Sequence, residues 1–337
     1  MTRNDSKLAF LRRAGWSDAH RTPLAGDASD RSYERLVMPE GRAVLMDAPP
    51  GRGDDPADFI AIARHLLGLN LSAPRILADD LANGFLLLED LGDGIYARLI
   101  AADPTQELPL YTEAVGVLAH LQSRPAPVGL PDLNAADWAE AAGFATDWYA
   151  FAITGHRPDR TAFTKCLADL LTQYADGPRV LILRDYHAEN LLWLPERAGL
   201  ARVGLLDFQL AQMGQPGYDL VSLLQDARRD VVLSTEAAMI RHFLTLTGQE
   251  QARFAPAYAV LGAQRALRIL GIFARLCLIA GKPGYLKLMP RVWDQLQRNL
   301  AHPALAPLRT ICDGLLPAPT PANMARIETQ CAKHLMP

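Results

Sequence analysis

The sequence predicts an α+β protein with two lobes, a small antiparallel β-sheet with few helices followed by a mostly helical region. The chain has 337 residues, half of them hydrophobic. At about 150 residues per domain, this is enough for two domains or lobes. Apolar residues form short strand-like runs up to about residue 92 and have mainly helical spacing after it. We therefore expect a β-rich lobe over 1–92, a helical lobe over 93–337 and a hinge near 89–93.

The N-terminal region contains two predicted hairpins with a helix between them. The turn Pro39-Glu40-Gly41 separates the strands of the first hairpin, and Pro56 occupies a favourable early position in the helix. The expected elements, in order, are a helix over 5–14, strands over 32–38 and 42–47, a helix from Pro56, and strands over 77–80 and 85–89. The order β-β-α-β-β is that of a small antiparallel sheet with one helix.

The C-terminal region is predicted to be helical except for one compact stretch of short strands. Helices are expected over 107–123, 136–154, 160–174, 234–247 and 251–281, and strands over 180–183, 191–194 and 203–206. Polar residues follow these apolar strands directly. A rigid scaffold holds such residues in place, and functional sites are often built this way.

The composition excludes several classes of function. The formal net charge is −3, whereas nucleic acids and anionic membranes favour a strong basic patch. The four cysteines fit no CxxC metal or redox pattern. The N-terminus is polar, and the apolar stretch 269–280 is interrupted by Arg275 and is shorter than the ~20 residues that span a bilayer. We expect a soluble cytoplasmic protein that binds neither nucleic acid nor membrane.

The polar loop 183–190 reads Leu-Arg-Asp-Tyr-His-Ala-Glu-Asn and leads into an apolar strand. In phosphoryl transfer, an aspartate such as Asp185 accepts the proton of the substrate hydroxyl. The amide oxygen of Asn190 is a neutral ligand for Mg²⁺. Taken alone, an Asp and an Asn at this spacing are common, and a solvated surface loop is the simpler interpretation.

A second acidic residue makes the pattern specific. Asp207 ends an apolar strand 17 residues after Asn190, and only a predicted hairpin separates the two. Such an aspartate can hold Mg²⁺ against the phosphates of a nucleotide. An Asp at a strand end is often only a turn or helix cap. The joint occurrence of Asp185, Asn190 and Asp207 is much more specific and predicts a phosphotransferase.

Two N-terminal stretches are candidate nucleotide contacts. Small and polar residues around Ser29 lead into the first predicted strand, where backbone N–H groups could bind phosphates. The run Phe85–Glu89 becomes acidic and then reaches Gly92. This is typical of a hinge, and backbone groups at Glu89 and Leu91 could bind an adenine edge. Taken alone, an ordinary turn is the simpler interpretation of each stretch.

Read together, these stretches resemble the aminoglycoside phosphotransferase family, which has a protein-kinase-like fold. The family's catalytic pattern, commonly H-x-D-x-H-x-x-N, matches at Asp185, His187 and Asn190, and Asp207 matches its metal-binding aspartate. Asp219 resembles the aspartate that stabilises the loop in the family. The resemblance covers about residues 20–300. It implies ATP as co-substrate, Mg²⁺ and a small-molecule hydroxyl acceptor.

A closer resemblance is to the anomeric sugar kinases that phosphorylate N-acetylmuramate and N-acetylglucosamine at C1 in bacterial cell-wall recycling. The resembling stretches are 26–36, 43–50, 87–93, 183–194, 218–231 and 270–276. This subgroup implies an amino-sugar acceptor. Candidate substrate contacts are His187, Gln209 and Arg228, the last as a partner for an acceptor carboxylate. For each of them, a loop hydrogen bond or a solvated charge is the simpler interpretation.

The sequence departs from the family at two positions. Leu183 replaces a mainly structural histidine. Met46 lies where kinase-like folds usually place a phosphate-binding lysine. Arg31 or Arg35 could supply the missing charge from the neighbouring strand, because arginine binds phosphate bidentately.

Two other functions fit the same residues. One is phosphorylation of another small acceptor, such as an aminoglycoside, choline or homoserine. The other is a catalytically silent nucleotide-binding scaffold, which the missing lysine suggests. The residues leave open ATP or GTP as donor and the oligomeric state.

Overall fold

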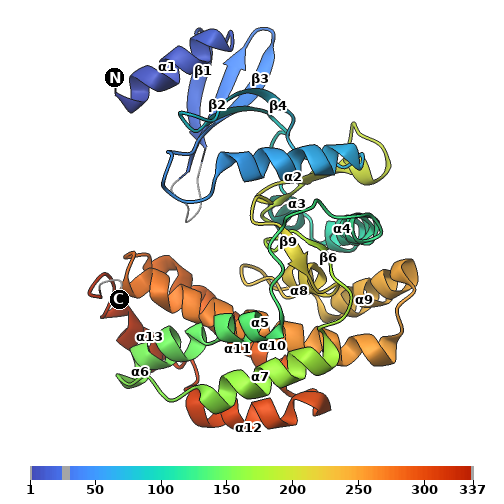
Figure 1. Ribbon diagram of the computed structural model, residues 1–337, viewed down its shortest axis with the longest axis vertical. Helices are drawn as coiled ribbons and strands as arrows, with labels where there is room; N and C mark the ends of the chain where they lie inside the picture. The colour runs from blue at the N-terminus through green and yellow to red at the C-terminus, as the bar shows by residue number, and fades with distance from the viewer. Residues whose placement is uncertain (1, 25–30, 335–337) are drawn as a thin grey trace. The chain divides into compact units, whose positions relative to one another are not determined.

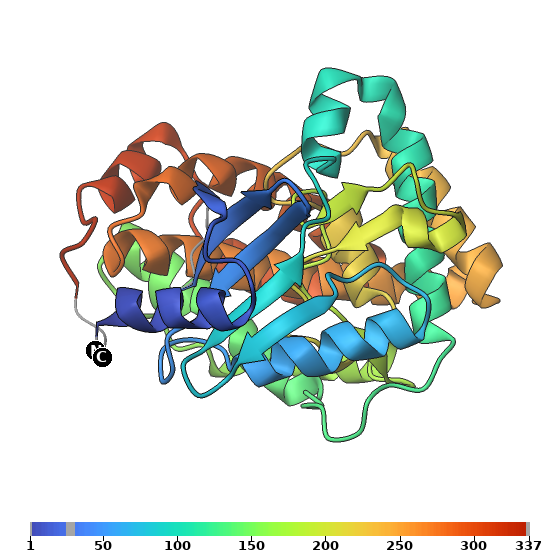
Figure 2. The ribbon, with the colours of Figure 1, turned by 90° about the horizontal axis from the view of Figure 1, so that it is seen from above.

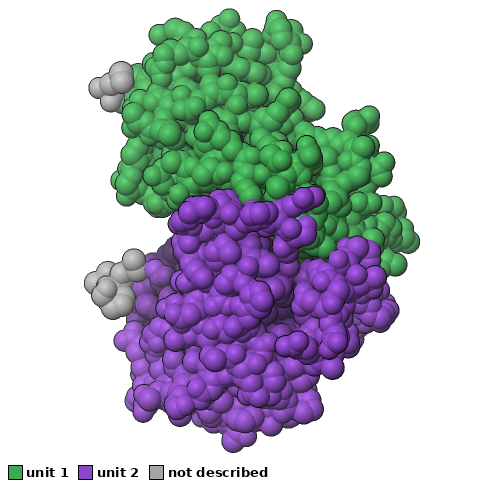
Figure 3. Space-filling view, turned by 45° about the vertical axis from the view of Figure 1, so that its right-hand side comes forward, with its two compact units in different colours: residues 1–121, 183–211 green, residues 122–182, 212–337 purple. Residues whose placement is uncertain are grey.

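The computed structural model describes residues 2–24 and 31–334. The chain divides into two compact units. The first comprises 1–121 with 183–211, and the second comprises 122–182 with 212–337 (Figure 3). Each unit therefore contains two separate stretches of the sequence. The loop and the hairpin that carry Asp185, Asn190 and Asp207 belong to the first unit.

The first unit is built on a five-stranded antiparallel sheet with the order β1-β2-β3-β5-β4 (Figure 1). The strands are β1 (His20–Leu24), β2 (Ser32–Met38), β3 (Gly41–Asp47), β4 (Ile76–Asp80) and β5 (Phe85–Glu89). The helices of this unit are α1 (Arg3–Arg13), α2 (Pro56–Gly68), α3 (Tyr96–Ala102) and α4 (Glu107–Gln122). In Figure 1, α2 runs beneath the sheet.

One face of the sheet packs against α1. Side chains alternate between the faces of a strand, so the residues of this face recur at every second position. Phe10 and Leu11 of α1 cover a cluster made of Leu36, Ala43, Leu45, Phe85 and Leu87. Figure 2 shows α1 beside these strands. The opposite face carries Met46, which is fully buried and pairs with Tyr33 on β2 and Leu86 on β5.

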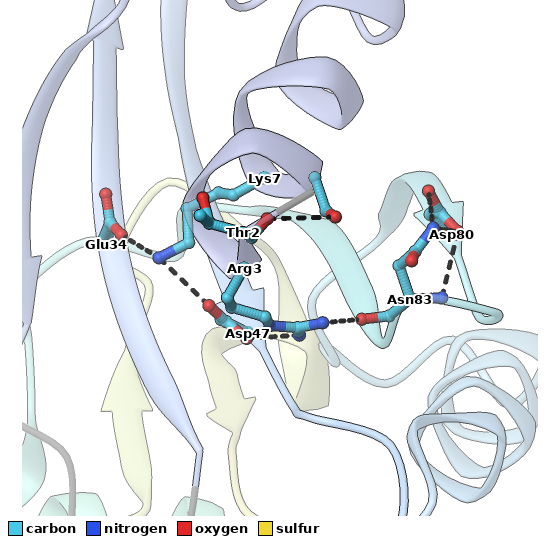
Figure 4. A network of polar contacts seen from close by, with 8 residues as sticks. Thr2, Arg3, Lys7, Glu34, Asp47, Asp80 and Asn83 are labelled. Atoms are coloured by element: carbon cyan, nitrogen blue, oxygen red, sulfur yellow. Dashed lines mark hydrogen bonds and ion pairs between the residues drawn. The ribbon is translucent and has the colours of Figure 1, made fainter.

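Charged residues fasten α1 to the same face of the sheet (Figure 4). Lys7 Nζ lies 2.7 Å from Glu34 Oε1 and 3.0 Å from Asp47 Oδ2. Arg3 donates to Asp47 Oδ1 at 3.0 Å and lies over the ring of Phe85, 3.9 Å from its centroid. Because these charges are partly buried, each has a partner of opposite sign, as buried charges require.

The stability of this contact is expected to depend on pH through Glu34. Burial would raise the pKa of Glu34, but hydrogen bonds from Arg21 and Lys7 outweigh burial and lower it. A carboxyl with a lowered folded pKa stabilises the protein above its unfolded pKa, about 4.3, and loses this contribution as the pH falls through the folded value. Glu34→Gln should therefore destabilise the protein at pH 7 by about 1–3 kcal/mol and much less at pH 3.

Urea titrations of the wild type and the variant at both pH values measure this difference. Glu40→Gln is the matched control, because Glu40 is exposed in the turn between β2 and β3. An equal loss of unfolding free energy for Glu34→Gln at pH 7 and pH 3 would contradict the assignment.

A small hairpin completes the first unit. Its strands are β7 (Leu191–Trp193) and β8 (Val203–Leu205). Leu205 N donates to Ser72 O at 2.8 Å, and Trp193 N donates to Gly94 O at 2.7 Å. These bonds tie the hairpin to two segments that adjoin the five-stranded sheet, just before β4 and just after the hinge. For this reason the compact unit extends well beyond residue 92.

The second unit is mostly helical. Its elements are α5 (Ala135–Ala142), a π-helical turn (Ala145–Ala150), α6 (Phe151–Thr154), α7 (Thr161–Tyr174), β6 (Val180–Ile182), β9 (Gln212–Gly214), α8 (Tyr218–Leu224), α9 (Leu233–Thr247), α10 (Gln251–Leu278), α11 (Met289–Leu300), α12 (Ala306–Leu315) and α13 (Pro321–Glu328). Helix α10 contacts α5, α7, α8 and α11. It is long and apolar enough to cross a membrane. However, 78% of its most apolar stretch of 18 residues is buried inside the protein, as in a core helix.

The α+β expectation is confirmed, together with both predicted hairpins and the long helices. Strands β1 and β9 and helices α3, α11, α12 and α13 were not predicted, and the helix predicted over 136–154 is divided into α5, the π-helical turn and α6. Strand β1 is an edge strand that contains Pro23 and has no buried residue, so it lacks the apolar alternation that identifies a strand. The boundary between lobes near residue 92 stays a prediction. The two compact units instead divide after residues 121, 182 and 211.

Candidate active site

The β7–β8 hairpin brings Asn190 and Asp207 together. Leu191 pairs with Leu205 in this hairpin, so the residues just outside the pair are also neighbours. Leu206 N donates to Asn190 O at 3.0 Å. The side-chain amide nitrogen of Asn190 lies 3.5 Å from Asp207 Oδ2. Two residues that are 17 positions apart in the sequence thus place an amide and a carboxylate in one site.

Hydrogen bonds hold the loop 183–190 in a defined conformation. Buried Tyr186 donates from its hydroxyl to Ala114 O of α4 at 2.8 Å. Ala97 N of α3 donates to Ala188 O at 3.0 Å. Within the loop, the Asn190 amide donates to Asp185 O at 2.9 Å. The backbone that carries Asp185 is therefore fixed both by neighbouring helices and by Asn190.

The Asp185 side chain is half-buried at the start of this loop. Within the described part of the chain, nothing forms a hydrogen bond or ion pair with its carboxylate. A carboxylate that is held rigidly and is not engaged by the protein can accept a proton from a substrate hydroxyl. This is the arrangement that a general base requires.

The backbone is strained at two residues of the site. Arg184, directly before Asp185, has φ +70°, and Asp207 has φ +56°. Non-glycine residues rarely adopt this left-handed conformation, which costs about 1–3 kcal/mol for a residue such as Arg184 and less for Asp, whose short polar side chain tolerates it. Arg184 directly precedes the candidate base, and Asp207 is itself a candidate metal ligand. The surrounding structure therefore imposes these side-chain positions.

The donor set around Asp207 fits Mg²⁺. No group of three or more His, Cys, Asp or Glu residues in the described ranges could hold a metal by itself. Mg²⁺ normally keeps several waters and binds one or two carboxylates together with substrate phosphates. The carboxylate of Asp207 lies beside the Asn190 side chain, whose amide nitrogen is 3.5 Å from Asp207 Oδ2. One carboxylate and one neighbouring amide suit a metal that arrives with a nucleotide.

The residues that follow Asp207 connect it to the N-terminal sheet region. Gln209 Nε2 donates to Asp207 Oδ1 at 2.8 Å and lies 3.5 Å from Asp54 Oδ2. The ring of Phe208 stacks on Phe59 of α2, with 4.8 Å between centroids. Asp54 in turn forms an ion pair with Arg31. A continuous polar network therefore runs from Arg31 through Asp54 and Gln209 to Asp207.

The two candidate phosphate-binding arginines lie in different places. Arg31 joins the Asp207 network just described. Arg35 forms ion pairs at the hinge instead, with its Nε 2.8 Å from Asp90 Oδ2 and its Nη2 2.9 Å from Asp93 Oδ1. The hydrogen bond from Arg35 also lowers the pKa of Asp93. Ser29 lies outside the described residues.

The hinge candidates Glu89 and Leu91 lie at and just beyond the end of β5. Glu89 N donates to Arg75 O at 2.9 Å, and the Glu89 side chain accepts from Arg197 at 2.8 Å. The side chain and the N–H of Glu89 are therefore engaged within the protein. Any contact between Glu89 and an adenine would have to use its backbone carbonyl.

Two further candidates, His187 and Arg228, were predicted to contact the substrate. His187 is buried, and its Nε2 lies 3.4 Å from the Asn190 amide nitrogen. Arg228 belongs to the second unit, where its backbone N donates to Asp226 Oδ1 at 2.8 Å. Their roles as substrate contacts stay predictions. Asp54 was not predicted as a site residue, because acidic residues just before a helix are usually caps.

Comparisons with known proteins find similar proteins over most of the chain. Residues 20–257 match the model of the phosphotransferase enzyme family (APH). A protein of Caulobacter vibrioides named N-acetylmuramate/N-acetylglucosamine kinase is 39% identical, and the alignment covers 94% of this chain and 98% of that protein. A Pseudomonas aeruginosa protein with the same name is 35% identical, with 87% and 89% covered.

The fold is similar to that of solved kinase structures. A choline/ethanolamine kinase family protein from Mesorhizobium loti superposes with a TM-score of 0.60 at 15% identity. The superposition covers 97% of this chain and all of that protein. At this identity the likeness concerns the fold alone.

Proposed function

This chain belongs to the phosphotransferase enzyme family, and from that premise we propose that it transfers the γ-phosphoryl group of ATP to the anomeric C1 hydroxyl of N-acetylmuramate or N-acetylglucosamine. The family makes it an ATP-dependent kinase of a small molecule. The names of the relatives, at 35–39% identity over most of the chain, support an amino sugar as the acceptor.

One observation carries the proposed chemistry. The uncommitted carboxylate of Asp185 lies in the same rigid loop as Asn190, which is adjacent to Asp207 at the end of a hairpin. A general base and a pair of metal-ligating oxygens are the two parts that phosphoryl transfer needs from the protein. A scaffold that only senses nucleotide would not need an unoccupied base beside them.

Each residue has a role in the proposed reaction. Asp185 orients the acceptor hydroxyl and takes its proton as the oxygen attacks the γ-phosphorus, while ADP leaves. Asn190 and Asp207 hold Mg²⁺, which neutralises charge on the phosphates when bound. The Glu89 carbonyl and the Leu91 N–H bind the adenine edge, and Arg31 binds phosphate. Preorganised positioning and charge supply most of the rate.

The acceptor side is assigned on chemical grounds. N-acetylmuramate carries a carboxylate, and Arg228 is the residue that we assign to it. His187 and Gln209 contact the metal-ligating residues, and we assign them to positioning the loop around the acceptor hydroxyl. ATP is a cytoplasmic co-substrate, and all four cysteines are free thiols, so we place the enzyme in the cytoplasm.

An ADP-release assay with a panel of acceptors tests the proposal. N-acetylmuramate and N-acetylglucosamine should be turned over, and their methyl glycosides, in which C1–OH is blocked, should not. Phosphorus NMR of the product should show a sugar 1-phosphate. Equal turnover of the methyl glycosides would move the reaction to another hydroxyl.

The same panel tests the alternative functions. Turnover only with choline, homoserine or an aminoglycoside would overturn the amino-sugar assignment. No turnover with any acceptor, together with intact ATP binding in a thermal-shift assay, would favour a scaffold.

A further inference from the structure

An ion pair between Arg31 and Asp54 lies at the edge of the Asp207 site. Arg31 directly precedes β2, and Asp54 lies in the loop before α2. The Arg31 side chain is only 4% exposed. A buried guanidinium needs a counter-charge, and removal of that partner leaves an uncompensated charge. Asp54 is therefore the group that keeps Arg31 charged and oriented inside the protein.

The ion pair with Asp54 leaves one hydrogen-bond donor of the Arg31 guanidinium without a partner among the described residues. Its Nε is buried and, within the described ranges, has no hydrogen-bond partner. Buried polar atoms without a partner are rare and call for an explanation such as a ligand. Guanidinium groups bind phosphate through two parallel N–H donors. The unused donor and the fixed charge together give Arg31 capacity for one more anionic partner.

Contacts through Gln209 link the Arg31–Asp54 pair to Asp207. Burial raises the pKa of Tyr33 above its usual value, although the charge of Arg31 and a hydrogen bond with Arg31 lower it, and the negative charges of Asp207 and Asp54 raise it further. Gln209 bridges the two carboxylates, donating to Asp207 at 2.8 Å and lying 3.5 Å from Asp54. The Gln209 Oε1 is also buried without a partner among the described residues. One amide thus couples the loop before α2 to the metal-ligating aspartate.

The strand position that normally supplies a lysine cannot supply charge here. Met46 is fully buried and pairs with Tyr33 and Leu86. In protein kinases, a lysine on the third strand is held by a glutamate of a helix, and this pair must be in place for activity. Arg31 and Asp54 offer the same two charges from different elements, namely the start of β2 and the loop before α2.

We propose that Asp54 is a positioning residue that holds Arg31 beside Asp207, so that Arg31 binds a phosphate of the nucleotide in place of the missing strand lysine. The inference rests on the proposed kinase function. Gln209 supports the arrangement by tying Asp54 to Asp207. Asp54 itself contacts neither the acceptor nor the transferred phosphoryl group.

The test compares ligands with and without phosphates by calorimetry. Arg31→Ala should weaken ADP binding by about 10–100-fold, and Asp54→Asn by about tenfold, while adenosine affinity stays within about twofold for both. The KM for ATP should rise in parallel, and the KM for the acceptor should not change. The double variant should bind ADP no more weakly than Arg31→Ala, because two members of one pair are not additive.

Matched controls separate this effect from general loss of charge or fold. Asp58→Asn removes a carboxylate from the exposed side of α2, and Arg52→Ala removes an exposed arginine from the same loop. Both should keep wild-type ADP affinity. If Asp54→Asn fails to fold, Asp54→Glu keeps the carboxylate and should retain the preference for ADP over adenosine.

Wild-type ADP affinity in Asp54→Asn would overturn the inference, as would an equal loss of adenosine and ADP affinity. If the losses of ADP affinity in the two single variants added up in the double variant, Arg31 and Asp54 would not act as a pair. Failure of the proposed function would give a different result. The wild type would then phosphorylate no amino sugar, whether or not it binds ADP more tightly than adenosine.

Discussion

Asp185→Asn is expected to lower kcat by about 10²–10⁴-fold, the usual contribution of a general base, while ATP affinity remains near the wild-type value. The amide has the same size as the carboxylate but cannot take the proton of the acceptor hydroxyl. Among the described residues the Asp185 carboxylate has no partner, so the substitution breaks no contact of the protein. The loss should therefore fall on turnover alone.

Steady-state kinetics with the sugar acceptor and ATP calorimetry measure the two quantities separately. Glu189→Gln is the matched control, because Glu189 is an exposed carboxylate in the same loop. It should retain full activity. Wild-type turnover in Asp185→Asn would remove Asp185 from the reaction and with it the proposed mechanism.

Asp207→Asn is expected to raise the Mg²⁺ concentration needed for half-maximal activity at least tenfold and to lower turnover at all Mg²⁺ concentrations. Loss of residues that merely support a metal ligand costs about 10–100-fold in affinity, so loss of a direct carboxylate ligand should cost no less. Asparagine also tolerates the left-handed conformation of Asp207 at φ +56°. The substitution therefore removes charge without adding backbone strain.

A magnesium titration of activity at fixed ATP measures the effect. Asp79→Asn serves as the control, because Asp79 is an exposed carboxylate of β4. Asp207→Ala should lose as much Mg²⁺ affinity as Asp207→Asn and should also be less stable, because alanine is strained at this φ. An unchanged Mg²⁺ requirement in Asp207→Asn would exclude Asp207 as a ligand.

The sequence by itself determined the fold class and the class of reaction, while the roles of the site residues stay predictions. The β-β-α-β-β order, the long helices and the set Asp185, Asn190 and Asp207 depend on local periodicity and on short motif spacing. A hairpin between two apolar strands necessarily brings its ends together, so the proximity of Asn190 and Asp207 could be expected before any coordinates. The family match confirms the kinase-like phosphotransferase interpretation.

Only the tertiary structure distinguished the two arginines and showed that Asp54 belongs to the network around Asp207. Arg31 and Arg35 look equivalent in the sequence, since both adjoin or belong to the same strand. Their ion pairs, with Asp54 and with Asp90 and Asp93, join segments 23 to 58 residues apart in the chain. The partner of each arginine depends on how strands and helices pack around its side chain. Local sequence patterns do not determine that packing, because it joins segments far apart in the chain.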